Sequence, residues 1–152
     1  VLRPVWGMLA EAAVPVVVHC GSGPLPGRHT GPGPFGAVLA AHPRLTAVIA
    51  HCGAPEYREH LELVRRYPNV HLDTTMVGTG FMNSLAPVPS DVVAAYGELA
   101  ERIVLGTDFP NIPYPYAEQL AALERFGLGD DWLRAVCWTN GVRLLGLPIG
   151  AG

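Results

Sequence analysis

Three polar residues, His19, His51 and Asp108, follow short apolar segments of the chain, and their chemical types are those of metal ligands. Each histidine ends a run of apolar residues that breaks at a glycine soon afterwards, and Asp108 ends a third such run. Buried parallel strands carry polar side chains to their carboxyl ends, where loops build active sites. Imidazole and carboxylate groups are ligands of zinc and other divalent ions. The three residues therefore predict part of a metal site.

Four short apolar segments have the composition of the buried strands that would position these side chains: residues 15–19, 46–51, 70–73 and 103–108. Segments with helical spacing alternate with them, at residues 4–13, 35–42, 57–67, 90–100, 115–126, 131–137 and 140–146. Ser90 and Asp91 have the chemistry of helix N-caps, and the long loop 76–89 is expected to be a lid or pocket wall. The alternation predicts an α/β fold with a parallel sheet covered by helices.

Two architectures fit this alternation, an open doubly wound sheet and part of a (β/α)8 barrel. In a flat sheet the ends of the first and fourth strands would lie about 14 Å apart, so His19 and Asp108 could not share an ion. Curling the sheet towards a barrel lets its inward side chains converge. A complete barrel needs about 250 residues. The 152 residues of this chain therefore predict a partial barrel of four strand units.

An open sheet that binds a nucleotide is the weaker alternative. Gly31, Gly33 and Gly36 imitate the glycines of a phosphate-binding loop. Such a loop holds phosphate with backbone N–H groups, which Pro32 and Pro34 lack. The segment is therefore expected to be an ordinary Gly/Pro-rich loop.

The composition argues against several classes of partner. All ten basic residues are arginines, the net charge is −3 and 15% of residues are charged, so no basic surface for nucleic acid is expected. The apolar runs are far shorter than the roughly 20 residues that cross a bilayer. Three cysteines, Cys20, Cys52 and Cys137, cannot all pair within one chain, which favours a reducing cytoplasm.

Several segments occur in the order and at the intervals of one enzyme family: Pro15–His19, Ala50–Gly53, Asn69–Thr75, Val104–Pro110 followed by Pro113-Tyr114, and Thr139–Leu147. With them the chain resembles the C-terminal half of the amidohydrolase-related family of metal-dependent (β/α)8-barrel enzymes. The resemblance is to the branch that includes aminocarboxymuconate-semialdehyde decarboxylase and related acid decarboxylases and hydrolases. It implies that residues 1–147 form barrel strands five to eight with their helices and that residues 148–152 are a tail.

The resemblance also implies roles for the three polar residues. His19, at the end of strand five, would be a metal ligand. His51, at the end of strand six, would orient or deprotonate the attacking water or contact the substrate. Asp108, at the end of strand eight, would bind the metal and shuttle a proton. The family's His-x-His pair on strand one does not occur in this sequence, so the chain is expected to hold only part of the site.

The chemistry of such a site follows from its ligands. A divalent metal lowers the pKa of bound water towards about 7, and Asp108 could accept the proton and return it to a leaving group. In a decarboxylase, the water and Asp108 would instead protonate the substrate carbon, with His51 assisting. Zinc is the expected ion, and manganese also suits mixed nitrogen and oxygen ligands.

A zinc site built from both His-Cys pairs, His19-Cys20 and His51-Cys52, is an alternative that strand geometry opposes. Successive side chains of an extended strand point to opposite faces, so a histidine and the adjacent cysteine cannot reach one ion. Cys20 and Cys52 are therefore expected to pack beneath helices.

The remaining polar residues are expected to have structural roles more often than functional ones. Asp73 either lines the pocket or bonds to nearby backbone. His29 and Arg28 lie in the Gly/Pro-rich loop, where solvated positions are more common than substrate contacts. Surface positions are expected for His42 and His60, and a packing position in a strand is expected for His71.

Three functions stay open from the sequence. The first is a metal-dependent hydrolase acting on a small molecule, the second a metal-dependent decarboxylase of an unsaturated or aromatic acid, and the third an inactive fragment that lacks the strand-one ligands. Half a barrel leaves unpaired strand edges, so self-association into a homo-oligomer is expected. The expected partners are a small-molecule substrate and copies of the chain, with neither nucleic acid nor membrane.

Overall fold

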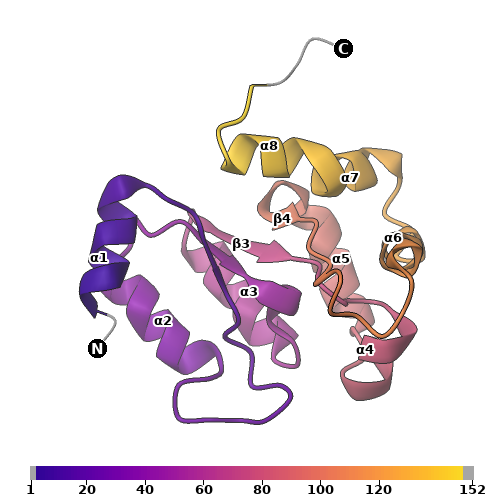
Figure 1. Cartoon of the computed structure of the whole chain (residues 1–152), viewed down its shortest axis with the longest axis horizontal. Coiled ribbons are helices and arrows are strands. Elements are labelled where there is room, and N and C mark those ends of the chain that lie inside the picture. Colours follow the sequence, from indigo (N-terminus) through magenta and orange to yellow (C-terminus); the bar gives the residue numbers. More distant parts are fainter. Residues whose placement is uncertain (1–2, 149–152) are drawn as a thin grey trace. The chain divides into compact units, whose positions relative to one another are not determined.

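The computed structural model describes residues 3–148 and divides between Asp73 and Thr74 into two compact units (Figure 1). The first unit contains α1 (Arg3–Ala12), β1 (Val16–Val18), α2 (Pro32–Ala41), β2 (Ala47–Ile49), the 3₁₀ turn η1 (Ala50–Gly53), α3 (Tyr57–Arg66) and β3 (Val70–Asp73). The second contains α4 (Gly80–Leu85), α5 (Ser90–Glu98), η2 (Ala100–Arg102), β4 (Ile103–Val104), α6 (Tyr116–Glu124), α7 (Asp130–Arg134), the π-helical turn η3 (Ala135–Thr139) and α8 (Asn140–Leu144). Helices and strands alternate as the sequence predicts.

The first unit is built on a parallel sheet in which β2 lies between β1 and β3. Val17 of β1 aligns with Val48 of β2, which aligns with His71 of β3. All three residues of β2 are buried, because the strand has a neighbour on each side and α2 and α3 add apolar side chains to the core. That burial explains the unbroken apolar run in its sequence.

The strand β1 has a different environment. Its middle residue, Val17, is 66% exposed, and α1 buries none of its side chains. Exposed apolar side chains on a strand and its preceding helix leave apolar surface that the described part of the chain does not cover.

The second unit holds its short strand with hydrogen bonds from both neighbouring segments. The Thr74 N–H donates to the Val104 carbonyl at 3.1 Å, and the Leu105 N–H donates to the Val136 carbonyl at 2.9 Å. The side-chain amide of Asn140 donates to the carbonyls of Ala100 and Ile103, both at 2.7 Å. These bonds fix the start of the loop that carries Asp108.

Several boundaries differ from those that the sequence predicts. The predicted lid 76–89 contains α4, capped by the Thr79 hydroxyl, which accepts from the Met82 N–H at 3.2 Å. The N-cap of α5 is Pro89, so Ser90 and Asp91 lie inside its first turn, where an acidic side chain still favours the helix dipole. The two predicted C-terminal helices join through the π-helical turn.

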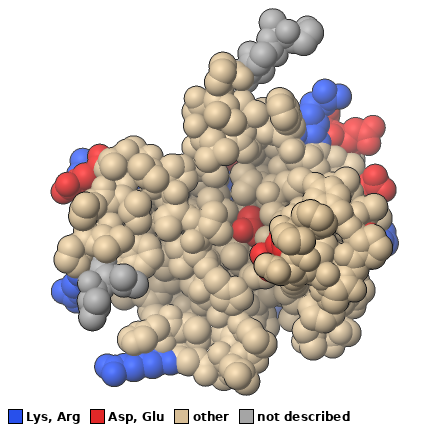
Figure 2. Space-filling view, in the orientation of Figure 1, with Lys and Arg blue, Asp and Glu red and all other residues tan. Residues whose placement is uncertain are grey.

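The surface is sparsely charged. On the face drawn in Figure 2, arginine and acidic side chains are scattered among large uncharged areas, as the composition predicts. Among residues 3–148, no helix is long and apolar enough to cross a bilayer.

Candidate active site

The structure brings His19 and His51 together. Their ring centroids lie 4.8 Å apart and the ring planes are inclined at 72°. The register of the parallel pair explains the contact, because Val18 aligns with Ile49 and the chain leaves both strands at the same edge of the sheet. Two neighbouring strands thus deliver two imidazoles to one place.

The strand before His51 is shorter than the predicted segment 46–51, because the backbone turns sharply after Ile49. His51 has φ 56° and ψ 28°, and Cys52 has φ 49° and ψ 23°, so both are left-handed. The His51 N–H donates to a carboxylate oxygen of buried Asp73 at 3.0 Å. Asp73 therefore stabilises the turn that carries His51. Of the two roles that the sequence allowed for Asp73, lining the pocket or bonding to nearby backbone, this is the second.

His19 follows β1 directly, and a hydrogen bond defines its ring. The Gly23 carbonyl can only accept, so Nε2–H of His19 donates to it at 3.0 Å, and in the neutral imidazole the lone pair is then on Nδ1. Metal-ligating histidines usually donate their second N–H to a carbonyl or carboxylate in this way. The ring is therefore in a state that suits a ligand.

A cavity of about 720 Å³ adjoins His19 within the first unit. Trp6 and Phe35 contribute apolar walls, and His29, His42 and Arg3 are also among the lining residues. No aspartate or glutamate lines it. The cavity therefore combines an apolar body with groups that attract anions. His29 is exposed, as the sequence predicts for this loop, and it also lies on the rim of the cavity.

Both neighbouring thiols are buried and have partners away from this pair. The Cys52 thiol donates to the Asp73 carbonyl at 3.1 Å. The sulfur of Cys20 lies 3.6 Å from Nε2 of His60, and burial raises the pKa of Cys20 to about 12. The predicted packing role of both cysteines is confirmed. The extended geometry assumed for His51 and Cys52 was wrong, since both are left-handed.

His60 is fully buried, and the surface position predicted for it is wrong. Its Nδ1–H donates to the Glu56 carbonyl one helical turn earlier, at 2.9 Å, so Nε2 can accept from the Cys20 thiol. A carboxylate oxygen of Glu56 accepts from the Ser22 N–H at 3.0 Å, and the other accepts from the Ser22 hydroxyl. This network ties the loop after β1 to α3.

We expect the first unit to lose stability as the pH falls, because of two groups in this network. Burial lowers the pKa of His60 below its ordinary 6.5. Burial alone would raise the pKa of Glu56, but the Ser22 hydrogen bonds bring it below 4.5. Both groups bind protons more readily in the unfolded chain, so their stabilisation is complete above the ordinary pKa values and is lost below them.

The pH effect is measured as the difference in Tm between pH 7.5 and pH 5.5. His60→Asn keeps a donor near the position of Nδ1 but cannot titrate, so its Tm is expected to change less than that of the wild type. His29→Asn, in an exposed loop, is the matched control. An equal change in Tm for wild type and His60→Asn would contradict the role of His60.

Replacing Gly53 by alanine is expected to destabilise the first unit by about 3 kcal/mol. Gly53 has φ +77°, and a Cβ atom there would clash with the His60 ring. Gly127→Ala is the control, since Gly127 has φ +68° but open space around its Cβ position, and it should cost about 1 kcal/mol. Urea denaturation measures both, and equal costs would show that the His60 contact does not matter.

In the second unit, Asp108 lies in a turn rather than at the end of a strand. The strand β4 ends at Val104, four residues before Asp108, so the predicted segment 103–108 is too long. Asp108 is left-handed, with φ 56°, and its carbonyl accepts from the Asn111 N–H at 2.7 Å. The side chain of this residue is exposed on its unit. The structure thus presents the carboxylate on a tight, hydrogen-bonded loop.

Gln119, a residue to which the sequence analysis gives no role, joins α6 to the segment that follows β3. Gln119 is fully buried and donates to the carbonyls of Thr74 at 3.0 Å and Val77 at 3.3 Å. Its carbonyl oxygen accepts from the Tyr114 hydroxyl at 3.4 Å. Burial and the negative charge of nearby Asp108 raise the pKa of Tyr114. A glutamine in an amphipathic helix gives no sequence signal of such a role.

The family to which the chain belongs follows from a comparison with protein families. The amidohydrolase family matches residues 1–147. The chain belongs to the amidohydrolase family. A comparison with curated proteins finds no match. The predicted family is therefore confirmed, whereas the aminocarboxymuconate-semialdehyde decarboxylase branch stays a prediction.

Solved structures similar to this amidohydrolase chain are TIM barrels and related enzymes. A TIM-barrel protein from Bordetella bronchiseptica is 25% identical, with a TM-score of 0.75 over 95% of this chain and 50% of its own. An amidohydrolase from Burkholderia multivorans with bound zinc is 17% identical, with a TM-score of 0.70 over 96% and 57%. 2,6-Dihydroxybenzoate decarboxylase from Rhizobium is 21% identical, with a TM-score of 0.57 over 95% and 55%.

This amidohydrolase chain thus spans about half the length of the solved structures that it matches. The predicted fold class, a partial (β/α)8 barrel, is confirmed. Within each unit, the described residues contain no group of three or more histidine, cysteine, aspartate or glutamate side chains that could hold a metal ion. The first unit supplies a pair of imidazoles and the second supplies a carboxylate, which are donors that suit zinc.

Proposed function

We propose that the chain carries part of the active site of a metal-dependent hydrolase that acts on a small molecule. The observation that carries the proposal is the His19–His51 pair, with ring centroids 4.8 Å apart after adjacent parallel strands. The hydrogen bond from His19 to the Gly23 carbonyl favours the tautomer with its proton on Nε2, in which Nδ1 can bind a metal. Membership of the amidohydrolase family supports the same chemistry.

His19 and Asp108 are the residues of this chain that would hold a divalent metal, with zinc the expected ion and manganese the alternative. A bound metal would supply Lewis acidity and a water of lowered pKa. The remaining ligands would come from outside residues 1–152. The family implies the metal, and the imidazole and carboxylate donors of the chain fit it.

The other steps belong to side chains of the chain. Asp108, as a carboxylate, accepts a proton from the nucleophile and returns it to the leaving group. The half-buried imidazole of His51, held by the Asp73–backbone bond, orients the nucleophile or contacts the substrate. The left-handed backbone at His51 and Asp108 is the kind of costly conformation that functional sites retain.

Decarboxylation of an unsaturated or aromatic acid is the second candidate, and the cavity beside His19 favours it. The lining contains Arg3, His29 and His42 without any acidic residue, so it suits a carboxylate. Trp6 and Phe35 suit an apolar or aromatic body. In this reaction Asp108 would first take a proton from water and then give it to the carbon, whose bond to the leaving carbon dioxide breaks.

The test uses the full-length protein that contains this chain, stripped of metal and then loaded with zinc or manganese. Small esters, lactones and amides are assayed for hydrolysis, and aromatic and unsaturated acids for release of carbon dioxide. Metal-dependent turnover that His19→Ala abolishes is the expected result. Hydrolysis favours the first candidate and carbon dioxide the second. Metal content and turnover unchanged in His19→Ala would overturn the proposal.

A further inference from the structure

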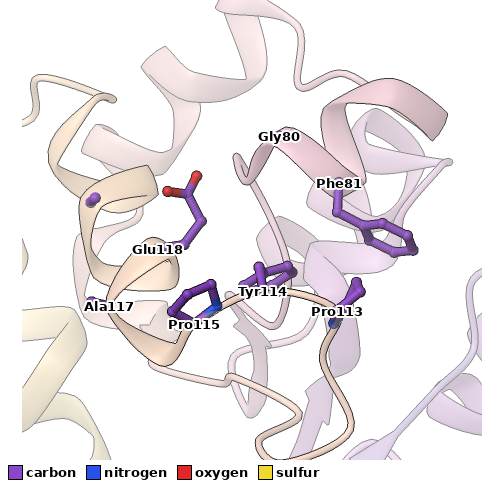
Figure 3. A pocket seen from close by; sticks show the side chains of 8 residues that line it. Gly80, Phe81, Pro113, Tyr114, Pro115, Ala117 and Glu118 are labelled. Atoms are coloured by element: carbon purple, nitrogen blue, oxygen red, sulfur yellow. The ribbon is translucent and has the colours of Figure 1, made fainter.

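A second pocket, of about 620 Å³, lies entirely within the second unit (Figure 3). Its walls come from the start of α4, the segment 113–115 and residues 117–121 of α6. His19, His51 and Asp108 do not line it. None of the residues proposed for catalysis therefore forms its wall, although Tyr114 lies near Asp108. The pocket is an open hollow whose volume is in the range of small-molecule sites.

Aromatic and proline side chains form one side of this pocket. Figure 3 shows Tyr114 between Pro113 and Pro115, with the ring of Phe81, from α4, near the Pro113 end of this row. The Phe81 and Tyr114 centroids are 6.5 Å apart and tilted by 45°, and Phe81 is 43% exposed. Aromatic and proline rings set at an angle offer faces and edges on which another flat ring can stack.

Small residues leave the space between these walls open. Gly80, Ala117 and Ala121 line the pocket, and a Cβ atom at Gly80 would meet nothing within 4 Å. The Tyr114 hydroxyl donates to the side-chain carbonyl of Gln119 at 3.4 Å, and this hydrogen bond restricts the position of the Tyr114 ring. A wall that is anchored in this way loses little conformational entropy when a ligand binds.

The charge of the lining selects among aromatic ligands. Of the residues that line the pocket, all within the described chain, Glu118 alone carries a charge. In Figure 3 its carboxylate points up from α6, away from the proline segment. Arg125, which does not line the pocket, donates to Glu118 at 2.7 Å and holds the carboxylate in place. The guanidinium of Arg125 balances much of the Glu118 charge, so the π faces of the lining are the feature that favours cations over anions.

We propose that this pocket binds a flat aromatic ring that is neutral or carries an ammonium group. The ring would stack against Phe81 and the Pro113–Pro115 segment, and an ammonium group would lie against the π faces of Phe81 and Tyr114. The preference is opposite to that of the cavity beside His19, which lacks acidic residues and suits anions.

The test measures binding to the metal-free full-length protein by ligand-observed NMR, with three probes of one size: benzylamine, benzyl alcohol and benzoate. Benzylamine and benzyl alcohol are expected to bind, and benzoate at least about fivefold more weakly than benzylamine. Benzoate binding as tightly as benzylamine, or the absence of binding by both other probes, would overturn the proposal. Metal and turnover play no part, so failure here is distinct from failure of the proposed function.

Two variants locate the binding. Phe81→Ala is expected to weaken benzylamine and benzyl alcohol at least about fivefold, because a stacking ring is lost. Glu118→Gln is expected to weaken benzylamine alone, by about threefold. Leu85→Ala is the matched control, since Leu85 lies on the same helix, is 67% exposed and does not line the pocket. Equal effects of Phe81→Ala and Leu85→Ala would show that the probes bind elsewhere.

Discussion

Replacement of Asp108 by asparagine is expected to lower turnover of the full-length protein by about a thousandfold or more. Asparagine has nearly the same shape as aspartate, but its amide can neither accept a proton from the nucleophile nor place a negative charge beside a metal. It also tolerates the left-handed backbone, which Asp108 adopts with φ 56°. The loop should therefore keep its conformation, and the loss should report on chemistry.

The measurement is turnover on the substrate found with the wild type, together with zinc content and Tm. Asp130→Asn is the control, because Asp130 is an exposed acid in the first turn of α7. Asp108→Asn is expected to lose turnover while its Tm stays unchanged. The control, Asp130→Asn, is expected to keep its turnover. A loss of less than about tenfold would remove Asp108 from proton transfer.

The strands and their order could be predicted because apolar β-branched runs are a direct signal of buried parallel strands. The valines of β1 and the Ala47–Ile49 run show this, and so does the position of His19 directly after its strand. The contact between His19 and His51 follows from the same reasoning, since neighbouring parallel strands end at one edge of the sheet.

The local backbone could not be predicted, because left-handed turns at residues other than glycine have weak sequence signals. His51 and Cys52 after β2, Met76 after β3 and Asp108 after β4 all have positive φ. Each shortens or follows a strand and redirects the side chains that come next. Such turns depend on tertiary hydrogen bonds, such as the one from the His51 N–H to Asp73, which a local pattern does not contain.

Buried polar residues are the second feature of the structure that could not be predicted from the sequence. His60 lies on a highly amphipathic helix, yet Gly53 leaves space for its ring and Cys20 gives it a partner. The burial of Gln119 could not be predicted either, since its amide donates to the carbonyls of Thr74 and Val77, which are more than forty residues away in the sequence. Whether a polar side chain is buried depends on such distant partners, and periodicity along one helix cannot show them.

The segment around Asn140 is a case in which a sequence motif has a physical explanation. Asn140 is 3% exposed, and its amide nitrogen donates to Ala100 and Ile103, both at 2.7 Å. The two carbonyls flank the entry to β4, which leads to the Asp108 loop. One side chain of α8 therefore joins the last helical segment to the strand that positions the candidate carboxylate.

Asn140→Ala is expected to destabilise the second unit by about 4 kcal/mol, because two buried carbonyls lose their donors and a cavity opens. Urea denaturation measures the change, and Asn111→Ala, at an exposed position, is the control that should change little. Asn140→Asp should cost at least as much, since a carboxylate cannot donate to the two carbonyls. If Asn140→Ala and Asn111→Ala cost the same, the amide does not hold β4. The loop of Asp108 must then be fixed by its other bonds, which join Val104 and Gly106 to Thr74 and Leu105 to Val136.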